Sequence, residues 1–304
     1  MTTLATQLAL QLNESIGLEP PPQPFLKWAG GKSQLLAQLL PLFPKKFNCY
    51  HEPFLGGAAV YWYLFSLKEK GTILFDGVRL SDINEELINC YIHVRSNLDN
   101  LIQELDFLKR NHNPENYYKV RELNPLNLSS VQRAARFIYL NKTCYNGLYR
   151  VNRSGKFNVP MGSYQDPRIF SAEQLIRNSY ALQNVAIECT NFQTVLDWAE
   201  PSDFIYFDPP YVPLSKTASF TSYTKYPFGQ EQQRELAEVF HTLNDRGCKL
   251  MLSNSWSEPV INLYQNFHCI ELKASRAINS NAERRGKISE LLVINYSPDY
   301  SNPT

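Results

Sequence analysis

Short apolar runs alternate with amphipathic helical stretches along most of this chain, and this alternation restricts the fold more than any single motif does. Helical patterns are predicted over residues 60–70 and 230–246, and Gly247 is placed to end the second of them. Strands that alternate with helices in this way predict an α/β sheet with helical crossovers. The predicted strands fall near residues 72–80, 185–189, 204–207, 248–253, 268–272 and 290–296.

The pattern changes in the middle of the chain. Helices are expected over residues 87–109 and 130–141, followed by a turn-rich, basic and aromatic segment that runs to Tyr164. We interpret this part as a recognition domain inserted into a catalytic domain. The predicted division is an N-terminal tail with a Pro-rich linker at 1–24, a catalytic domain at 25–85 and 181–298, the inserted domain at 86–180, and a C-terminal tail at 299–304.

The apolar run 204–207 ends in Asp208-Pro209-Pro210-Tyr211. Because proline fixes its own φ, the carbonyl of Pro209 is held in place before any reaction. If Asp208 and this carbonyl each accept one hydrogen of an amino group on a base, the nitrogen lone pair can point outward. Tyr211 could stack on the same base, a contact worth about 1–3 kcal/mol. The tetrapeptide therefore predicts a clamp for a methyl-accepting amino group, although a strand that simply ends in a proline turn has the same residues.

A second motif, Glu52-Pro53-Phe54-Leu55-Gly56, follows a short predicted strand. Glycine at its end lets the backbone approach a ligand closely. The full G-x-G-x-x-G dinucleotide fingerprint is absent, so the motif is weak when taken alone. Its cofactor-binding candidates are Glu52, Phe54 and Gly56.

Asp82 and Ile83 close the next apolar stretch. An acidic residue at the end of the second strand of an open α/β sheet binds ribose hydroxyls. The other interpretation of Asp82 is a helix N-cap, with Glu85 three residues later completing a capping box. Both roles can hold at once.

A third segment, residues 25–33, ends in Gly31-Lys32-Ser33 and looks like a phosphate loop. It is not a Walker A motif, because the position that requires the first glycine holds Leu26. What remains is an indole, Trp28, and a cation, Lys32, beside a glycine turn. These groups suit a sulfonium cofactor with an amino-acid tail.

Five motifs in a fixed order resemble the Dam family of DNA adenine-N6 methyltransferases, in the alpha group and D12 class, and the resemblance extends from about residue 25 to residue 296. The motifs are FLKWAGGK (25–32), EPFLGGA (52–58), LSDINEEL (80–87), YNGLYRVNRSGKFNVP (145–160) and DPPY (208–211). The resemblance implies a Rossmann-like methyltransferase fold with a mixed seven-stranded sheet, helices on both faces and the last strand inserted antiparallel. It implies S-adenosylmethionine as the cofactor, and adenine within GATC in double-stranded DNA as the target.

The segment 146–160 is expected to form a hairpin that enters a DNA groove. Arg150 suits paired hydrogen bonds with a guanine edge, and Leu148 and Pro160 suit contact with a thymine methyl group. Tyr145 could insert into the base stack. Family members use the matching positions for these roles, and Lys27 matches a lysine that reaches a guanine. The further DNA-binding candidates are Asn146, Tyr164, Arg276 and Arg284, and Ser163 departs from relatives that carry arginine there.

The formal net charge is only +1, but the cations are gathered locally. One patch contains Lys142, Arg150, Arg153 and Lys156 without an acid, and a second spans residues 276–287. Localised basic patches are what phosphate binding requires, although solvated basic surfaces are common.

The six cysteines show no C-x-x-C pair and are expected not to cluster with the five histidines, so we predict no zinc site and no metal cofactor. No signal peptide and no membrane-spanning stretch is recognised. The protein is expected in the cytoplasm, with reduced thiols. It is expected to bind DNA as a monomer and not to associate with a membrane. A cognate restriction endonuclease could belong to the same system.

Because the amino group of a paired adenine is inaccessible in the duplex, the base must be flipped out, and residues 220–226 could close over it. Two other interpretations stay open. One is an amino-methyltransferase that acts on RNA or on protein glutamine, because related clamps serve amide nitrogens. The other is a DNA-binding module that retained the fold and lost the reaction.

Overall fold

The computed structural model describes residues 20–28, 30–152, 155–211, 228–275 and 287–298. In this part of the chain a mixed seven-stranded sheet has the order β3-β2-β1-β4-β5-β7-β6. The strands β1 to β5 run parallel, whereas β7 is antiparallel to both neighbours, as the resemblance implied. Their bounds are β1 Cys49–Glu52, β2 Gly77–Asp82, β3 Ala186–Cys189, β4 Phe204–Phe207, β5 Lys249–Ser255, β6 His268–Ser275 and β7 Lys287–Ile294.

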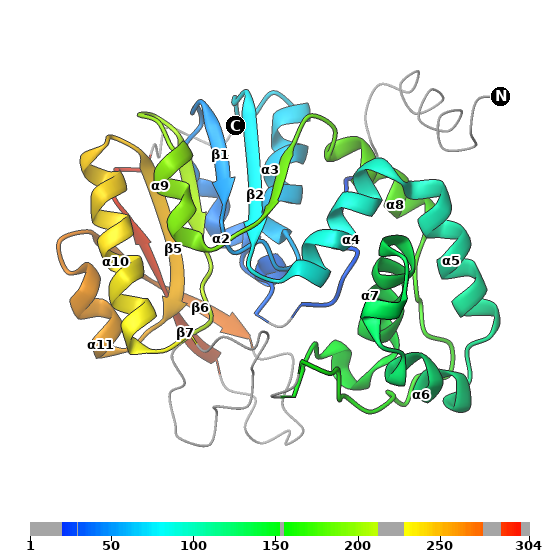
Figure 1. Ribbon diagram of the computed structural model, residues 1–304. Helices are drawn as coiled ribbons and strands as arrows, with labels where there is room; N and C mark the ends of the chain where they lie inside the picture. The colour runs from blue at the N-terminus through cyan, green and yellow to red at the C-terminus, as the bar shows by residue number, and fades with distance from the viewer. Residues whose placement is uncertain (1–19, 29, 153–154, 212–227, 276–286, 299–304) are drawn as a thin grey trace.

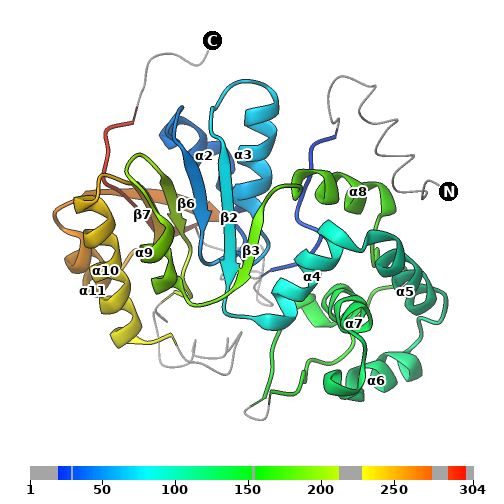
Figure 2. The ribbon, with the colours of Figure 1, turned by 45° about the horizontal axis from the view of Figure 1, so that its top comes forward.

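Helices cover both faces of the sheet, and α4 to α8 gather beside it (Figures 1 and 2). The α-helices are α2 Leu36–Leu39, α3 Ala59–Glu69, α4 Glu85–Ser96, α5 Leu98–Arg110, α6 Pro114–Glu122, α7 Ser130–Thr143, α8 Ala172–Ala181, α9 Val195–Trp198, α10 Gln230–Asp245 and α11 Glu258–Ile261. The 3-10 helices are η1 Lys32–Gln34, η2 Leu40–Leu42, η3 Pro125–Asn127, η4 Tyr145–Gly147, η5 Phe192–Thr194 and η7 Asn262–Tyr264.

The sequence of β4 explains why both faces are covered. Successive side chains of a strand point to opposite faces, and all four residues of β4 are apolar and buried. Phe204 and Tyr206 join the cluster packed by α2, α3 and α4. Ile205 and Phe207 join the cluster packed by α9, α10 and α11. A continuous apolar run of this kind is typical of a parallel strand whose two faces are both buried.

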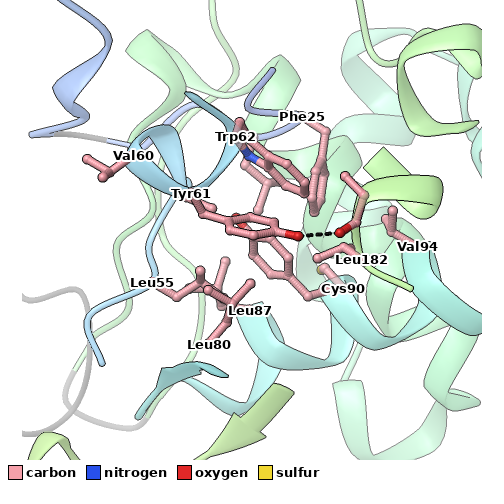
Figure 3. Close-up of a cluster of buried hydrophobic side chains, with 14 of the residues drawn as sticks. Phe25, Leu55, Val60, Tyr61, Trp62, Leu80, Leu87, Cys90, Val94 and Leu182 are labelled. Carbon is pink, nitrogen blue, oxygen red and sulfur yellow. Dashed lines mark hydrogen bonds between the residues drawn. The ribbon is translucent and has the colours of Figure 1, made fainter. Parts of the chain in front are cut away.

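A buried cluster ties the sheet to the helices beside it. In Figure 3, Trp62 and Tyr61 of α3 meet Cys90 and Val94 of α4, with Phe25 packed against them. The hydroxyl of Tyr61 donates a hydrogen bond to the carbonyl of Ala181 at the end of α8, and the figure draws this bond as a dashed line. The side chains of one hydrophobic cluster therefore continue from the sheet into the helical region. The division into a catalytic and a recognition domain stays a prediction.

The helical region differs from its prediction in two places. The single helix expected over 87–109 is two helices, because Asn97 leaves the helical conformation at φ −146° and separates α4 from α5. The helix α6 was not predicted. Asn113 caps it by accepting from the Asn116 N–H, and Pro114 occupies its first turn, where no backbone donor is needed.

Several strand ends also shift. The strand expected over 72–80 begins only at Gly77, and the strands expected over 268–272 and 290–296 are β6 and β7, which extend farther toward each other. The helix predicted over 230–246 is α10, and Gly247 follows it with φ 87°, the left-handed conformation that ends a helix.

A buried contact between a histidine and an acid joins β1 to the residue that directly precedes β4. His51 Nε2 lies 2.8 Å from Asp203 Oδ2, and both side chains are at most 4% exposed. The Asp203 carboxyl group also accepts hydrogen bonds from the backbone N–H groups of Cys49 and Glu200. Burial opposes ionisation of Asp203, but these hydrogen bonds outweigh it and lower the pKa of the carboxyl. The contact fixes β1 against β4, whose far ends carry the site described below.

The expectation that cysteines and histidines stay apart was wrong. Cys49, His51 and Asp203 place one potential ligand atom each within 4.8 Å of one another. Burial, with Asp203 nearby, raises the pKa of the Cys49 thiol to about 12, so the thiolate that zinc prefers is disfavoured. The absence of a metal cofactor stays a prediction.

Replacing Asp203 by alanine should lower the free energy of unfolding by about 1–3 kcal/mol at pH 7, because buried donors lose their acceptor. Since the folded pKa of Asp203 is lowered, its contribution exists above the unfolded pKa and disappears as the pH falls through the folded pKa. Urea unfolding from pH 3 to 7 measures both effects. Asp76→Ala, which changes an exposed acid, is the control and should alter stability by less than about 0.5 kcal/mol. Equal losses in the two variants would contradict the assigned contact.

Candidate functional site

The order in which the chain adds strands to the sheet reverses between β1 and β4. The chain proceeds from β1 outward to β2 and β3, then returns to the other side of β1 to form β4. Ligands of open α/β sheets bind at the carboxyl ends of the strands at such a switch point. Glu52 ends β1, Asp82 ends β2, and Asp208 directly follows β4. Three sequence-predicted site residues therefore lie at one edge of the sheet.

Lys32 and Asp208 form an ion pair at this edge. The Lys32 ammonium lies 2.7 Å from Oδ1 and 2.8 Å from Oδ2 of Asp208, and it also donates to the Gly30 carbonyl. The Lys32 side chain is 3% exposed and that of Asp208 is 21% exposed. Burial raises the pKa of Asp208, Lys32 opposes this rise, and Glu290 adds to it. The sequence motif predicts Lys32 as a cofactor ligand and gives no sign of this partner.

The turn that follows Asp208 is held by a hydrogen bond from a side chain of α10. Pro209 is buried and Pro210 is exposed. The carbonyl of Pro210 accepts a hydrogen bond of 3.1 Å from Gln233 Nε2. Gln233, which is 2% exposed, in turn accepts a bond of 3.0 Å from the side chain of Asn254. Sequence reasoning missed these two residues, although a glutamine on the apolar face of α10 and an asparagine in the apolar β5 were available signals.

Gly56 and Asp82 connect the loop after β1 to the end of β2. The Gly56 N–H donates to Asp82 Oδ2 at 3.1 Å, and the Asn84 N–H donates to Oδ1 at 2.9 Å. Burial raises the pKa of Asp82 to about 6 against these hydrogen bonds. The N-cap of α4 is Asn84, which accepts from the Leu87 N–H, so the capping role considered for Asp82 was wrong. A two-residue shift of the helix start is the reason.

Trp28 packs directly on Gly56. A Cβ added to Gly56, whose φ is 46°, would lie 2.7 Å from the Trp28 ring. The indole also stacks with the rings of Tyr149, 5.9 Å away, and Phe137, 6.4 Å away. Glycine at position 56 is therefore required both by its backbone conformation and by this close approach.

The other cofactor candidates occupy different surroundings. Glu52 is buried and accepts a 2.9 Å hydrogen bond from the Tyr50 hydroxyl, and burial raises its pKa well above the usual range. Ile83 is 43% exposed. Phe54 is half-buried and stacks on Phe192 at 5.4 Å, and Phe228 meets both rings edge-on. Sequence reasoning missed Phe192 and Phe228.

Lys27 contacts both α7 and the segment that follows α7. Asn141 of α7, fully buried, accepts from the Lys27 N–H and donates to its carbonyl. The Lys27 ammonium lies 4.4 Å from the centre of the Tyr164 ring. A Cβ on Gly147, with φ 65°, would lie 2.6 Å from the Lys27 side chain. These contacts bring two predicted DNA-binding residues together.

Residues on the two sides of the hairpin predicted over 146–160 pair with each other in the described part of the structure. Isolated antiparallel bridges join Cys144 to Met161 and Val151 to Phe157. Tyr145 is 47% exposed, and its N–H donates to the carbonyl of the exposed Pro160.

The remaining hairpin candidates differ in their surroundings. Asn146 is exposed with φ 55°, whereas Leu148 is partly buried against the core. Arg150 Nε donates to Asn158 Oδ1 at 2.8 Å. The other predicted DNA contacts, Arg276 and Arg284, and the segment 220–226 lie outside the described residues.

Comparison with known proteins identifies the family. A model of the D12 class N6 adenine-specific DNA methyltransferases matches residues 28–278. The type II methyltransferase M.MjaIII of Methanocaldococcus jannaschii is 46% identical over 90% of this chain and 99% of its own length. The type II methyltransferase M1.LlaDCHI of Lactococcus lactis subsp. cremoris is 39% identical over 90% and 95% of the two chains. The DNA adenine methylase of Escherichia coli K12 is 36% identical over 92% and 97%.

The open α/β sheet and its switch-point site place the protein in the Rossmann-like class of ligand-binding folds. The chain belongs to the D12 class of N6 adenine-specific DNA methyltransferases. This result confirms the resemblance and decides against RNA or protein glutamine as the acceptor. Among the described residues, no helix combines the length and apolar character that crossing a membrane requires.

The residues at the edge of the sheet fit the family's cofactor, S-adenosylmethionine. The carboxyl groups of Asp82 and Asp208 lie at this edge, and the cation Lys32 pairs with Asp208. Burial favours the neutral form of the third acid, Glu52, so Glu52 adds no charge to this edge. Such an edge suits a ligand that carries a positive sulfonium and an amino-acid group. The half-buried Phe54 adds an apolar surface for a flat ring.

Proposed function

We propose that the protein transfers a methyl group from S-adenosylmethionine to N6 of an adenine flipped out of double-stranded DNA, within the sequence GATC. The observation that carries this proposal is the Lys32–Asp208 pair beside the rigid turn 209–211, at the switch point of the sheet. The proposed catalytic residues are Asp208, Pro209, Pro210 and Tyr211.

Asp208 is suited to accept hydrogen bonds from the target amino group. A carboxylate offers about four acceptor positions, so the Lys32 contacts leave others available. Lys32 favours the ionised form of this buried acid. The amino group is far too weak an acid to lose its proton to a carboxylate first, so Asp208 acts by stabilising the positive charge that develops on N6. The cofactor supplies the electrophilic methyl group.

The proposed cofactor-binding residues are Trp28, Lys32, Glu52, Phe54, Gly56, Asp82, Ile83 and Asp208. The geometry favours a direct role for Asp82 and Ile83, which end β2 beside Gly56. Trp28 and Glu52 are enclosed by protein groups, so we assign them mainly to shaping this site.

The hairpin is the proposed element that reads DNA. Its exposed Tyr145 and Asn146 could enter the space left by the flipped base, and Lys27 with Tyr164 would face the adjoining base pair. Unstacking a base costs a few kcal/mol. Stacking on Tyr145 and Tyr211, together with phosphate contacts, would offset that cost.

Methylation of a set of short duplexes tests the target word. One duplex carries GATC and the others differ from it at a single base pair. We expect N6-methyladenine, measured by mass spectrometry, to form at least about tenfold faster on GATC, because one wrong base pair costs about 1–3 kcal/mol. Equal rates on a substituted site would overturn the GATC assignment, and equal rates on matched RNA would overturn the choice of duplex DNA.

Arg150→Ala should relax discrimination at one base pair of the target by about 1–3 kcal/mol, because the side chain can donate two hydrogen bonds to a guanine edge. The ratio of kcat/KM values for matched and substituted duplexes measures the effect. Lys156→Ala is the control for phosphate binding and should weaken all duplexes similarly. If Arg150→Ala left every ratio unchanged, Arg150 would have no part in base recognition.

The biological setting is part of the proposal. The two type II methyltransferases among the relatives favour a restriction endonuclease of the same target word as a partner in the cell. We place the enzyme in the cytoplasm, acting on DNA as a monomer. Sedimentation of the protein on a single-site duplex tests the stoichiometry, and a complex of two proteins with one duplex would contradict it.

A further inference from the structure

Glu290 lies at the tip of the proposed clamp, although it comes from a distant part of the chain. It belongs to β7 and is paired with Ser255 of β5 and Leu272 of β6. Its Oε2 atom accepts a hydrogen bond of 2.7 Å from the Tyr211 hydroxyl. The residues Leu291, Leu292, Val293 and Ile294 that follow it are fully buried and apolar. Glu290, the acid that directly precedes this apolar run within β7, therefore has a specific partner.

The contact fixes an aromatic ring at its outer end. A hydrogen bond between a hydroxyl and a carboxylate is charge-assisted and stronger than one between neutral groups. Burial, together with the nearby Asp208 and Glu290, raises the pKa of Tyr211, so the hydroxyl keeps the proton that it donates. The β7 strand is held on both sides by β5 and β6, so the acceptor has a fixed position.

A second contact orients the same ring with respect to Asp208. The Lys32 ammonium, which binds both oxygens of Asp208, lies 4.9 Å from the centre of the Tyr211 ring. The ring is therefore held by Glu290 at its hydroxyl and by Lys32 near its face. Both contacts must persist if a stacked base is to present its amino group to Asp208.

We propose that Glu290 is a positioning residue that holds Tyr211 in the orientation needed to stack the target adenine. The inference rests on the proposed role of residues 208–211. Glu290 acts through the Tyr211 hydroxyl and touches neither substrate nor cofactor. A glutamine at this position could still accept the hydrogen bond, whereas an alanine could not.

A double-mutant cycle tests the proposal. We expect Glu290→Ala and Tyr211→Phe each to lower kcat about tenfold, with little change in KM for DNA, and the double variant to be no slower than either single one. Glu290→Gln should stay within about threefold of the wild type. A duplex with 2-aminopurine at the target position should show weaker fluorescence quenching in the two single variants, because the flipped base stacks less well.

Three outcomes would overturn the positioning role. The first is a Glu290→Ala variant with the kcat of the wild type. The second is a double variant about a hundredfold slower, which means that the two residues act independently. The third is a Glu290→Gln variant as slow as Glu290→Ala, which assigns the effect to charge. If Glu290→Ala does not fold, the proposal is tested by the other two variants. It then requires a Tyr211→Phe variant with a kcat about tenfold below the wild type and a Glu290→Gln variant within about threefold of it.

Two further variants separate this inference from the proposed function. Glu271→Ala removes an exposed acid from the adjacent strand β6, where it binds Lys273 and Ser289, and should leave kcat unchanged. Asp208→Ala is measured in the same assay. An active Asp208→Ala refutes the clamp itself. An inactive Asp208→Ala together with a fully active Glu290→Ala refutes only the positioning role.

Discussion

Asp208→Ala should lower kcat by about a thousandfold or more while leaving the affinity for duplex DNA nearly unchanged. The variant removes the acceptor that is proposed to align N6 and to stabilise its developing charge, and a group of this kind contributes about 10²–10³ in rate. Asp208→Ala also removes the counterion of Lys32, and a buried cation without a counterion adds to the loss. Single-turnover methylation measures the rate, and fluorescence anisotropy of a labelled duplex measures the affinity.

Asp208→Asn refines the same test. An amide keeps one acceptor oxygen but loses the charge, so we expect a rate between those of the wild type and Asp208→Ala. Asp76→Ala, at the opposite edge of the sheet just before β2, is the matched control and should keep the wild-type rate. Turnover in Asp208→Ala close to that of this control would exclude the proposed clamp.

Lys32→Met should produce the second largest loss, a decrease in kcat/KM of about a hundredfold at pH 7. The ammonium of Lys32 contacts both oxygens of Asp208 and favours the ionised form that accepts hydrogen bonds, so its removal weakens the proposed clamp. Burial and Glu290 raise the pKa of Asp208, and Lys32 is the group that opposes them. Without Lys32 the pKa of Asp208 rises further, so more of the acid is protonated at a given pH. The acid limb of the pH profile of kcat/KM should therefore move to higher pH.

Two measurements keep the interpretation of Lys32→Met specific. Lys32→Arg retains the charge and should show a smaller displacement of the acid limb, although guanidinium and ammonium groups differ in shape. The affinity for S-adenosylmethionine, measured by calorimetry, separates a loss of cofactor binding from a loss of acid control. If the pH profile kept its position and only the cofactor affinity fell, Lys32 would act on the cofactor rather than through Asp208.

Local sequence patterns predicted much of the sheet because the composition of each strand reflects its surroundings. The run 204–207 is apolar at every position and is buried on both sides. The helix α10 ends at Asp245, two residues before Gly247, the glycine that was predicted to end it. The break at Asn97 was not predicted, because apolar residues that become buried in the structure continue on both sides of it and no glycine or proline separates α4 from α5. The antiparallel placement of β7 came from the family resemblance, since strand direction leaves no local mark in the sequence.

The site was predictable residue by residue but not contact by contact. Asp208 and Tyr211 stand in a recognisable motif, yet their partners Lys32 and Glu290 lie 176 and 79 positions away. Only the order of the strands brings them together. Gln233 and Asn254 are polar residues at buried positions, which is the pattern that could have identified them. The assignment of Asp82 changed because Asn84 is the residue that caps α4.

A crystal structure of the enzyme with a GATC duplex and a non-reactive cofactor analogue tests the central claim most directly. We expect the target adenine to be flipped, with N6 within about 3 Å of the Asp208 carboxylate and of the Pro209 carbonyl. The same structure should show the ring of Tyr211 stacked on the base. An adenine that remains paired, or a flipped adenine whose N6 contacts neither oxygen, would contradict the proposed clamp.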